Sequence, residues 1–168
     1  ASFYHLQKDI EMITRRSLLA LAVVPVAGAL LAPFASVADE MAKMKVYTQD
    51  GVAIRGADPV AYFAQNAFVQ GDASHALEWG GATWHFASAE NKATFMADPK
   101  TYAPQFGGYC AYAASKGALA DGDPEAWTIH NGKLYLNFSK NVRTIWLEDR
   151  DANIALAEAN WPTLSMQN

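Results

Sequence analysis

The centre of the chain carries the strongest structural signals: TWHFASAEN at residues 83–91, DPKTY at residues 98–102 and GGYCAYA at residues 107–113. Trp84 and Phe86 alternate with smaller or polar residues, which predicts a strand with one apolar face. Ser88 follows this strand and is expected to cap a helix over residues 89–97. The third segment contains Cys110, the only cysteine in the chain. A chemical site, if there is one, is expected near this cysteine.

Two β-hairpins are predicted from short turns that contain glycine. Their arms are residues 75–79 with residues 82–87, and residues 126–130 with residues 133–138. Gly80-Gly81 forms the first turn, and Asn131-Gly132 is the strongest sequence signal for a type I′ turn. No βαβ repetition is present. The sequence therefore predicts an α+β fold, with a small antiparallel sheet of β-hairpins packed against short helices.

Two helices are predicted after the second hairpin. Ser139 is expected to cap the first of them, which extends through Leu147. Asp151 is expected to cap the second, and Pro162 is expected to mark its end. The residues of the last helix that are predicted to pack inward are Ile154, Ala155 and Leu156.

The amino-terminal segment has the features of an export signal. Residues 14–19 read TRRSLL, and the run from residue 18 to residue 35 contains no charged residue. A twin-arginine pair, an apolar run and small residues before a cleavage position are typical of twin-arginine export. Residues 1–38 are therefore predicted to be an upstream extension followed by a signal cleaved after Ala38. Residues 39–168 are predicted to form one periplasmic domain, attached to the membrane only if the signal is not cleaved.

Composition narrows the functional classes. The chain has 168 residues, of which 51% are hydrophobic, and this suits one globular domain with a real core. A single cysteine excludes an intramolecular disulfide framework. The formal net charge is −4 and no run of basic residues occurs, so nucleic acid is not an expected partner.

Several of these segments resemble the YHS domain family, and in particular the exported YHS domain-containing proteins of proteobacteria. The resemblance extends over residues 46–162. The segments that carry it are DPV at 58–60, WHF at 84–86, DPKTY at 98–102, DGVAIRG at 50–56, ASAEN at 87–91, YCAY at 109–112 and GKLYLN at 132–137.

This resemblance implies a connection with metals, because YHS domains occur beside copper- and heavy-metal transport modules and many carry cysteines. The present chain departs from that pattern. Ala61, Ala87 and Asn91 occupy the positions where the metal-associated form has cysteine. Cys110 is the only thiol that remains.

A transition-metal site is the leading interpretation of Cys110. A thiolate with imidazoles suits copper or zinc. The candidate ligands are Cys110, His75, His85 and His130, with the Met96 thioether as a further donor. None of these residues are paired at a local ligand spacing. The expected function is therefore that of a small exported binding domain, with the binding or handling of copper or zinc as the leading hypothesis.

Two alternatives stay open. Cys110 could be the nucleophile of a thiol-dependent enzyme if a helix amino terminus or a base lowered its pKa. It could instead be a small buried residue in a scaffold that binds a protein partner. Six aromatic residues could line a ligand pocket or fill the core: Trp79, Trp84, Tyr109, Tyr112, Trp127 and Tyr135.

Overall fold

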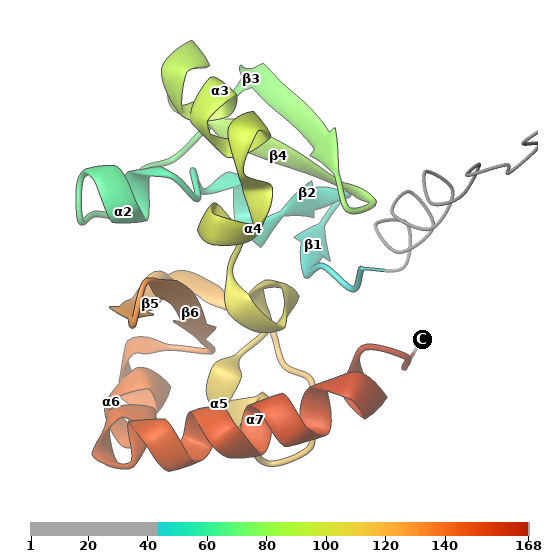
Figure 1. Cartoon of the computed structure of the whole chain (residues 1–168), viewed down its shortest axis with the longest axis vertical. Coiled ribbons are helices and arrows are strands. Elements are labelled where there is room, and N and C mark those ends of the chain that lie inside the picture. The colour runs from blue at the N-terminus through green and yellow to red at the C-terminus, as the bar shows by residue number, and fades with distance from the viewer. Residues whose placement is uncertain (1–43, 168) are drawn as a thin grey trace, which may run out of the picture. The chain divides into compact units, whose positions relative to one another are not determined.

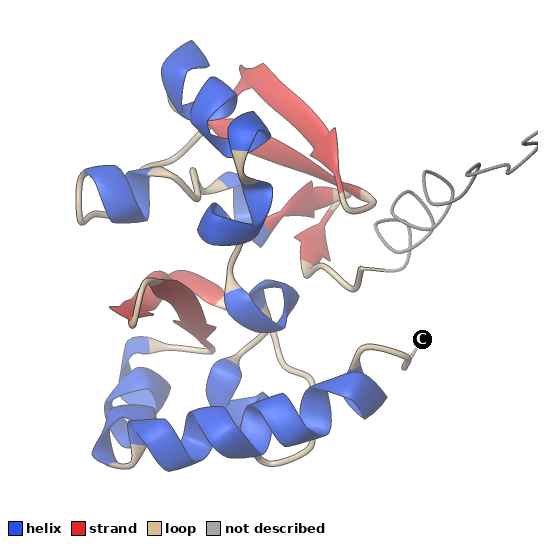
Figure 2. Cartoon of the chain, in the orientation of Figure 1, coloured by secondary structure: helices blue, strands red, loops and turns tan. Residues whose placement is uncertain are grey.

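A computed structural model describes residues 44–167 and has the expected α+β architecture (Figures 1 and 2). It contains two small sheets, where the sequence predicted one. The export signal and the cleavage position after Ala38 lie outside the described residues. Within residues 44–167, none of the helices combines the length and the apolar character that a membrane span needs.

The first sheet has four strands in the order β1-β2-β4-β3. Their bounds are β1 Thr48–Gln49, β2 Val52–Ala53, β3 Asp72–Trp79 and β4 Ala82–Phe86. The predicted Gly80-Gly81 turn joins β3 to β4, with φ of 61° and 77°. Strand β2 is shorter than the apolar run around it, because the 3₁₀ turn η1 (Ile54–Gly56) follows it at once. β2 pairs with β4 in parallel, which the sequence did not predict.

Three helical segments accompany this sheet: α2 (Ala61–Ala64), α3 (Ala89–Ala97) and α4 (Pro99–Tyr102). The predicted cap of α3 is confirmed, since Ser88 Oγ accepts from the Asn91 N–H at 3.1 Å. The alternation in β4 is also confirmed, because Trp84 and Phe86 are buried against Phe95 of α3. The first core therefore lies between this sheet and α3.

Asp58 connects three segments of this half of the structure. It is fully buried, and its Oδ1 accepts from the backbone N–H groups of Val60 at 2.9 Å and Ala61 at 3.3 Å. Its Oδ2 accepts from the Ala87 N–H at 2.8 Å and from Asn91 Nδ2 at 2.7 Å. Four hydrogen bonds satisfy the carboxylate, and they hold the start of α2, the end of β4 and the first turn of α3 together.

The second sheet is the hairpin of β5 (Asp123–His130) and β6 (Lys133–Asn137). Asn131 and Gly132 have φ of 50° and 71°, as a type I′ turn requires, so this turn is confirmed. Strand β6 is buried on both faces. Leu134 and Leu136 belong to the first core, whereas Tyr135 belongs to a second core among the later helices. β6 is therefore the wall that the two cores share.

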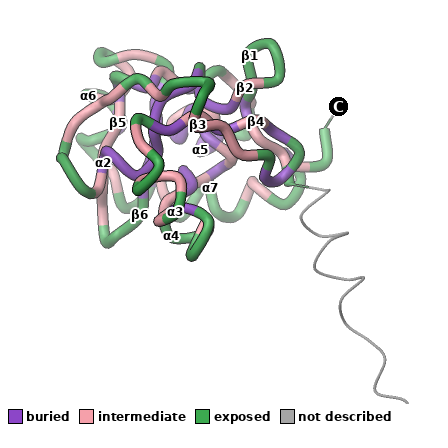
Figure 3. The backbone as a smooth tube through the Cα atoms, turned by 90° about the horizontal axis from the view of Figure 1, so that it is seen from above, coloured by how far each residue is buried: buried purple, intermediate pink, exposed green. Residues whose placement is uncertain are grey.

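The second core is built from α5 (Ala111–Ser115), α6 (Lys140–Glu148) and α7 (Arg150–Leu164). The predicted cap of α6 is confirmed, with Ser139 Oγ accepting from the Val142 N–H at 3.2 Å. Figure 3 shows the buried backbone inside the described domain and the exposed backbone along the outer turns.

The prediction for the last helix was wrong at both ends. Asp149, not Asp151, precedes α7, and the helix continues through Pro162 to Leu164. Proline removes one N–H from the ladder, but this occurs in the final turn, which the Ser165 N–H closes on the Trp161 carbonyl at 2.8 Å.

The inward face of α7 also differs from the prediction. Ala155 and Leu156 are exposed, and Ile154 is only partly buried. Asn153, Ala157 and Leu164 are the buried residues. The polar Asn153 can be buried because its Nδ2 donates to the Trp146 carbonyl at 3.1 Å and its Oδ1 accepts from Ser115 Oγ at 3.2 Å. Helical spacing, rather than side-chain hydrophobicity, selects this face.

Candidate functional site

Cys110 lies in the interior, at the position that caps α5. Its relative exposure is 1%. Its Sγ accepts from the Ala113 N–H at 3.4 Å and donates to Asn137 Oδ1 at 3.7 Å. Its own N–H donates to the Ala120 carbonyl at 2.9 Å. The thiol is therefore engaged inside the fold, and a nucleophile that must reach a substrate from solvent is not favoured.

The neighbouring Asn137 tests whether a metal fits here. Its Oδ1 accepts from the Tyr112 N–H at 3.1 Å as well as from Cys110, and the residue is fully buried. Asn137 Nδ2 has no hydrogen-bond partner within residues 44–167. An amide N–H₂ group is a donor and does not ligate a cation. The unpaired polar atom beside Cys110 is therefore of the wrong kind for a metal site.

The two glycines before Cys110 have a packing role. Gly107 has φ of 58°, and a Cβ there would overlap the Lys45 carbonyl oxygen. The Gly107 carbonyl also accepts from the Tyr47 N–H at 2.9 Å. At Gly108 a Cβ would lie 2.5 Å from Ile54 Cγ2. The Gly-Gly pair is needed because two other segments cross it closely, whatever the role of the thiol.

The structure does not bring the four predicted metal ligands together. His75 and His85 lie on the β3–β4 hairpin of the first sheet, where His85 Nδ1 is beside Gly56. His130 ends β5, and its Nε2 is 3.2 Å from Asp151 Oδ1. Across residues 44–167, no group of three or more His, Cys, Asp or Glu side chains is placed to hold a metal ion. These four residues therefore do not form one copper or zinc site.

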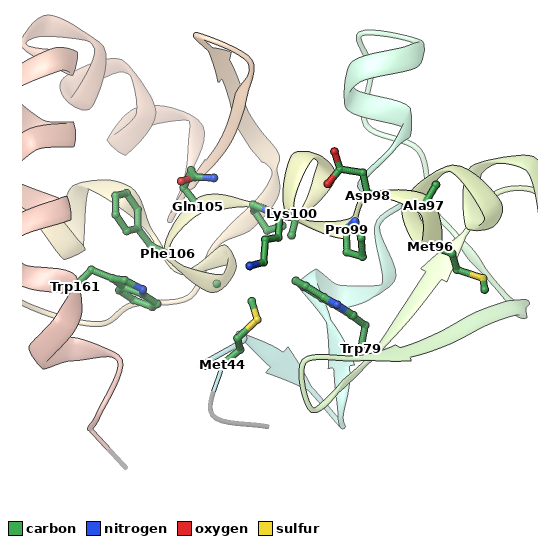
Figure 4. Close-up of a pocket in the computed structure, with 13 residues that line it drawn as sticks. Met44, Trp79, Met96, Ala97, Asp98, Pro99, Lys100, Gln105, Phe106 and Trp161 are labelled. Carbon is green, nitrogen blue, oxygen red and sulfur yellow. The ribbon is translucent and has the colours of Figure 1, made fainter. Parts of the chain in front are cut away.

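An apolar pocket of about 640 Å³ is the other candidate (Figure 4). The large side chains that line it are Met44, Trp79, Met96, Pro99, Phe106 and Trp161. They come from the chain before β1, the end of β3, α3, α4, the 3₁₀ turn η2 (Gln105–Gly108) and α7. In Figure 4, Trp79 and Met96 stand on one side of the pocket, and Phe106 and Trp161 stand on the other.

Local sequence positions these walls. Asp98 accepts from Thr101 Oγ1 at 2.7 Å, and this cap separates α3 from α4 so that the chain bends around the pocket. Phe106 has φ of 54°, which turns the chain sharply into Gly107. The aromatic walls are held by packing: Trp79 lies edge-on against Phe95, which is outside the pocket, at 5.4 Å, and the wall residues Phe106 and Trp161 lie edge-on against each other at 5.7 Å. The pocket is therefore largely preformed.

Sequence reasoning identified only part of this lining. Trp79 was among the aromatic residues weighed for a pocket, and Met96 was named only as a metal donor. Trp161 was missed because it directly precedes Pro162, where the last helix was predicted to end. Its position seven residues after Ile154, which was predicted to pack inward, is the signal that would have placed it on the same face of α7.

No protein-family model, curated protein or solved structure matches the chain. The pocket is therefore the feature from which function is argued.

Proposed function

We propose that the chain is a small exported binding domain of the YHS type, and that its ligand is an apolar molecule held in the pocket between Trp79 and Trp161. The observation that carries the proposal is the pocket itself. Small-molecule sites are concave, mostly apolar, and about 300–1,000 Å³ in volume. The pocket has about 640 Å³ and aromatic walls on both sides.

The lining supports binding in preference to catalysis. Within the described residues it contains no serine, threonine, cysteine or histidine. The hydroxyl and thiol nucleophiles and the histidine bases of covalent catalysis are therefore missing from these walls. Rigid aromatic rings give a ligand a large contact area, and methionine side chains adapt to its shape. Met96 is 57% exposed and Met44 is 36% exposed, so both are available to cover a ligand.

The size of the walls sets the expected affinity. A probe that buries about 300 Å² of apolar surface gains about 7.5 kcal/mol, at about 25 cal/mol per Å². The loss of translational and rotational freedom offsets part of this gain. A simple apolar ligand is therefore expected to bind with micromolar affinity at best.

The test uses the full-length chain and the neutral fluorescent probe N-phenyl-1-naphthylamine. We expect saturable fluorescence enhancement with the native chain. Ala97→Trp fills the pocket from the end of α3 and should abolish the enhancement. Ala93→Trp adds the same side chain to an exposed position of the same helix, outside the pocket, and should bind like the native chain. Equal binding by both variants would refute the pocket as the site.

The export part of the proposal rests on residues 14–38 of the sequence. It predicts that the variant with both Arg15 and Arg16 replaced by lysine stays in the cytoplasm, as measured by cell fractionation. Periplasmic recovery of that variant would remove the twin-arginine element of the proposal.

A further inference from the structure

Two charged side chains line the pocket, Asp98 and Lys100. Asp98 is already used at the start of α4. Its Oδ2 accepts from Thr101 Oγ1 at 2.7 Å and its Oδ1 accepts from the Thr101 N–H at 3.4 Å. In Figure 4 its carboxylate points away from the nitrogen of Lys100. Asp98 therefore forms no direct ion pair with Lys100.

The ammonium group of Lys100 makes no hydrogen bond or ion pair with any residue from 44 to 167. Lys140 and Lys133 are engaged, with Nζ 2.7 Å from Glu125 and 3.5 Å from Glu158 respectively, whereas Lys92, outside the pocket, is unpaired like Lys100 within the described residues. Figure 4 shows the Lys100 side chain reaching into the middle of the pocket, between the two tryptophans. The pocket thus combines apolar walls with a central ammonium group that forms no ion pair among the described residues.

The indole groups of the two tryptophans contain hydrogen-bond donors and no acceptors. An indole N–H donates and cannot accept a hydrogen bond. Neither Trp79 Nε1 nor Trp161 Nε1 donates to an acceptor within the described part of the chain. Neither indole can therefore accept a hydrogen bond from a ligand.

From this arrangement we infer that the ligand is an apolar carboxylic acid, whose carboxylate pairs with Lys100 while its hydrocarbon part lies between Trp79 and Trp161. This inference rests on the proposed function, because it names the ligand class of the same pocket. An ion pair is stronger beside apolar walls than in open water, since the local dielectric constant is lower. Hydrogen bonds to a charged acceptor are also stronger than neutral ones. A cationic ligand in the same position would be repelled by the ammonium group of Lys100.

The experiment measures how decanoate, decanol and decylamine displace N-phenyl-1-naphthylamine from the full-length chain. These ligands share one alkyl chain and differ in the charge of the head group. With the native chain we expect decanoate to bind about tenfold more tightly than decanol, and decylamine to bind most weakly. Lys100→Met should weaken decanoate about tenfold and leave decanol unchanged. Lys100→Glu should reverse the order and favour decylamine.

Lys92→Met is the matched control, because it removes a lysine from α3 outside the pocket and should leave all three affinities unchanged. If decanol binds as tightly as decanoate and Lys100→Met changes neither, the inference is overturned while the proposed apolar site stands. If the probe itself does not bind, or binds equally to Ala97→Trp, both proposals are overturned.

Discussion

Asp58→Asn tests whether one buried carboxylate holds the first half of the fold together. Asp58 is fully buried and accepts four hydrogen bonds, two on each oxygen. Asparagine has almost the same shape, but one of its two acceptor oxygens becomes an N–H₂ donor. If the amide oxygen keeps the bonds to Val60 and Ala61, the N–H₂ group faces the Ala87 N–H and Asn91 Nδ2. Three hydrogen-bond donor groups then face one another with no acceptor between them.

The number of hydrogen bonds that are lost determines the expected decrease in the free energy of unfolding. Hydrogen bonds to a charged group contribute about 1.5–3 kcal/mol each, so the loss of two costs about 3–6 kcal/mol. Relief of the burial cost of the charge offsets part of this, because no cation within residues 44–167 pairs with Asp58. We therefore expect the free energy of unfolding to fall by about 3 kcal/mol. Native domains have a total of about 5–15 kcal/mol, so the variant would be seriously weakened.

The assay is urea unfolding followed by tryptophan fluorescence, with the denaturant slope m compared between variants. Asp50→Asn makes the same chemical change in an exposed turn at φ of 54°, where asparagine is well tolerated, and should change stability by less than about 0.5 kcal/mol. A double-mutant cycle with Asn91→Ala should give a coupling energy of about 1 kcal/mol or more. A loss below about 1 kcal/mol for Asp58→Asn would refute this account.

Three further predictions concern packing, backbone and pH. Cys110→Ala should lower stability by about 1–3 kcal/mol and leave copper and zinc content unchanged in native mass spectrometry; a stoichiometric metal lost in the variant would contradict the packing role. Gly107→Ala should cost about 3 kcal/mol or more in chemical unfolding, because a Cβ there overlaps a carbonyl oxygen, whereas Gly132→Ala, in open space at φ of 71°, should cost about 1 kcal/mol. The hydrogen bond from Lys140, followed by its charge, lowers the pKa of Glu125 below 4.5, so this carboxylate stabilises the fold above that pH and its contribution is lost as pH falls through the lowered pKa. Lys140→Met should therefore weaken the pH dependence of unfolding between about pH 5 and pH 3, and an unchanged profile would exclude a role for the pair.

Local signals in the sequence predicted the elements of secondary structure well. The Asn131-Gly132 turn and the caps at Ser88 and Ser139 depend on residues within a few positions of one another. The structure confirms all three. The prediction for the C-terminal end of the last helix was wrong because a proline in the final turn, such as Pro162, removes only one hydrogen bond.

Tertiary arrangements could not be predicted in the same way. The bonds of Asp58 to Ala87 and Asn91 join segments that are about thirty residues apart in sequence. The pocket collects Met44, Trp79 and Trp161 from opposite ends of the domain. The chemistry of the Cys110 thiol suggested a functional site, whereas the structure buries this side chain among packing contacts. A single sequence does not show which segments, distant along the chain, come into contact in the fold.

Strand β6 has a consequence for how order is gained and lost. Its two faces belong to different cores, and its backbone pairs with β5 on one edge while Leu136 bridges to Cys110 on the other. Neither core can be dismantled without exposing one face of this strand. The amide protons of β6 should therefore be among the slowest to exchange with deuterium. Thermal unfolding should be one cooperative transition in which both cores unfold together.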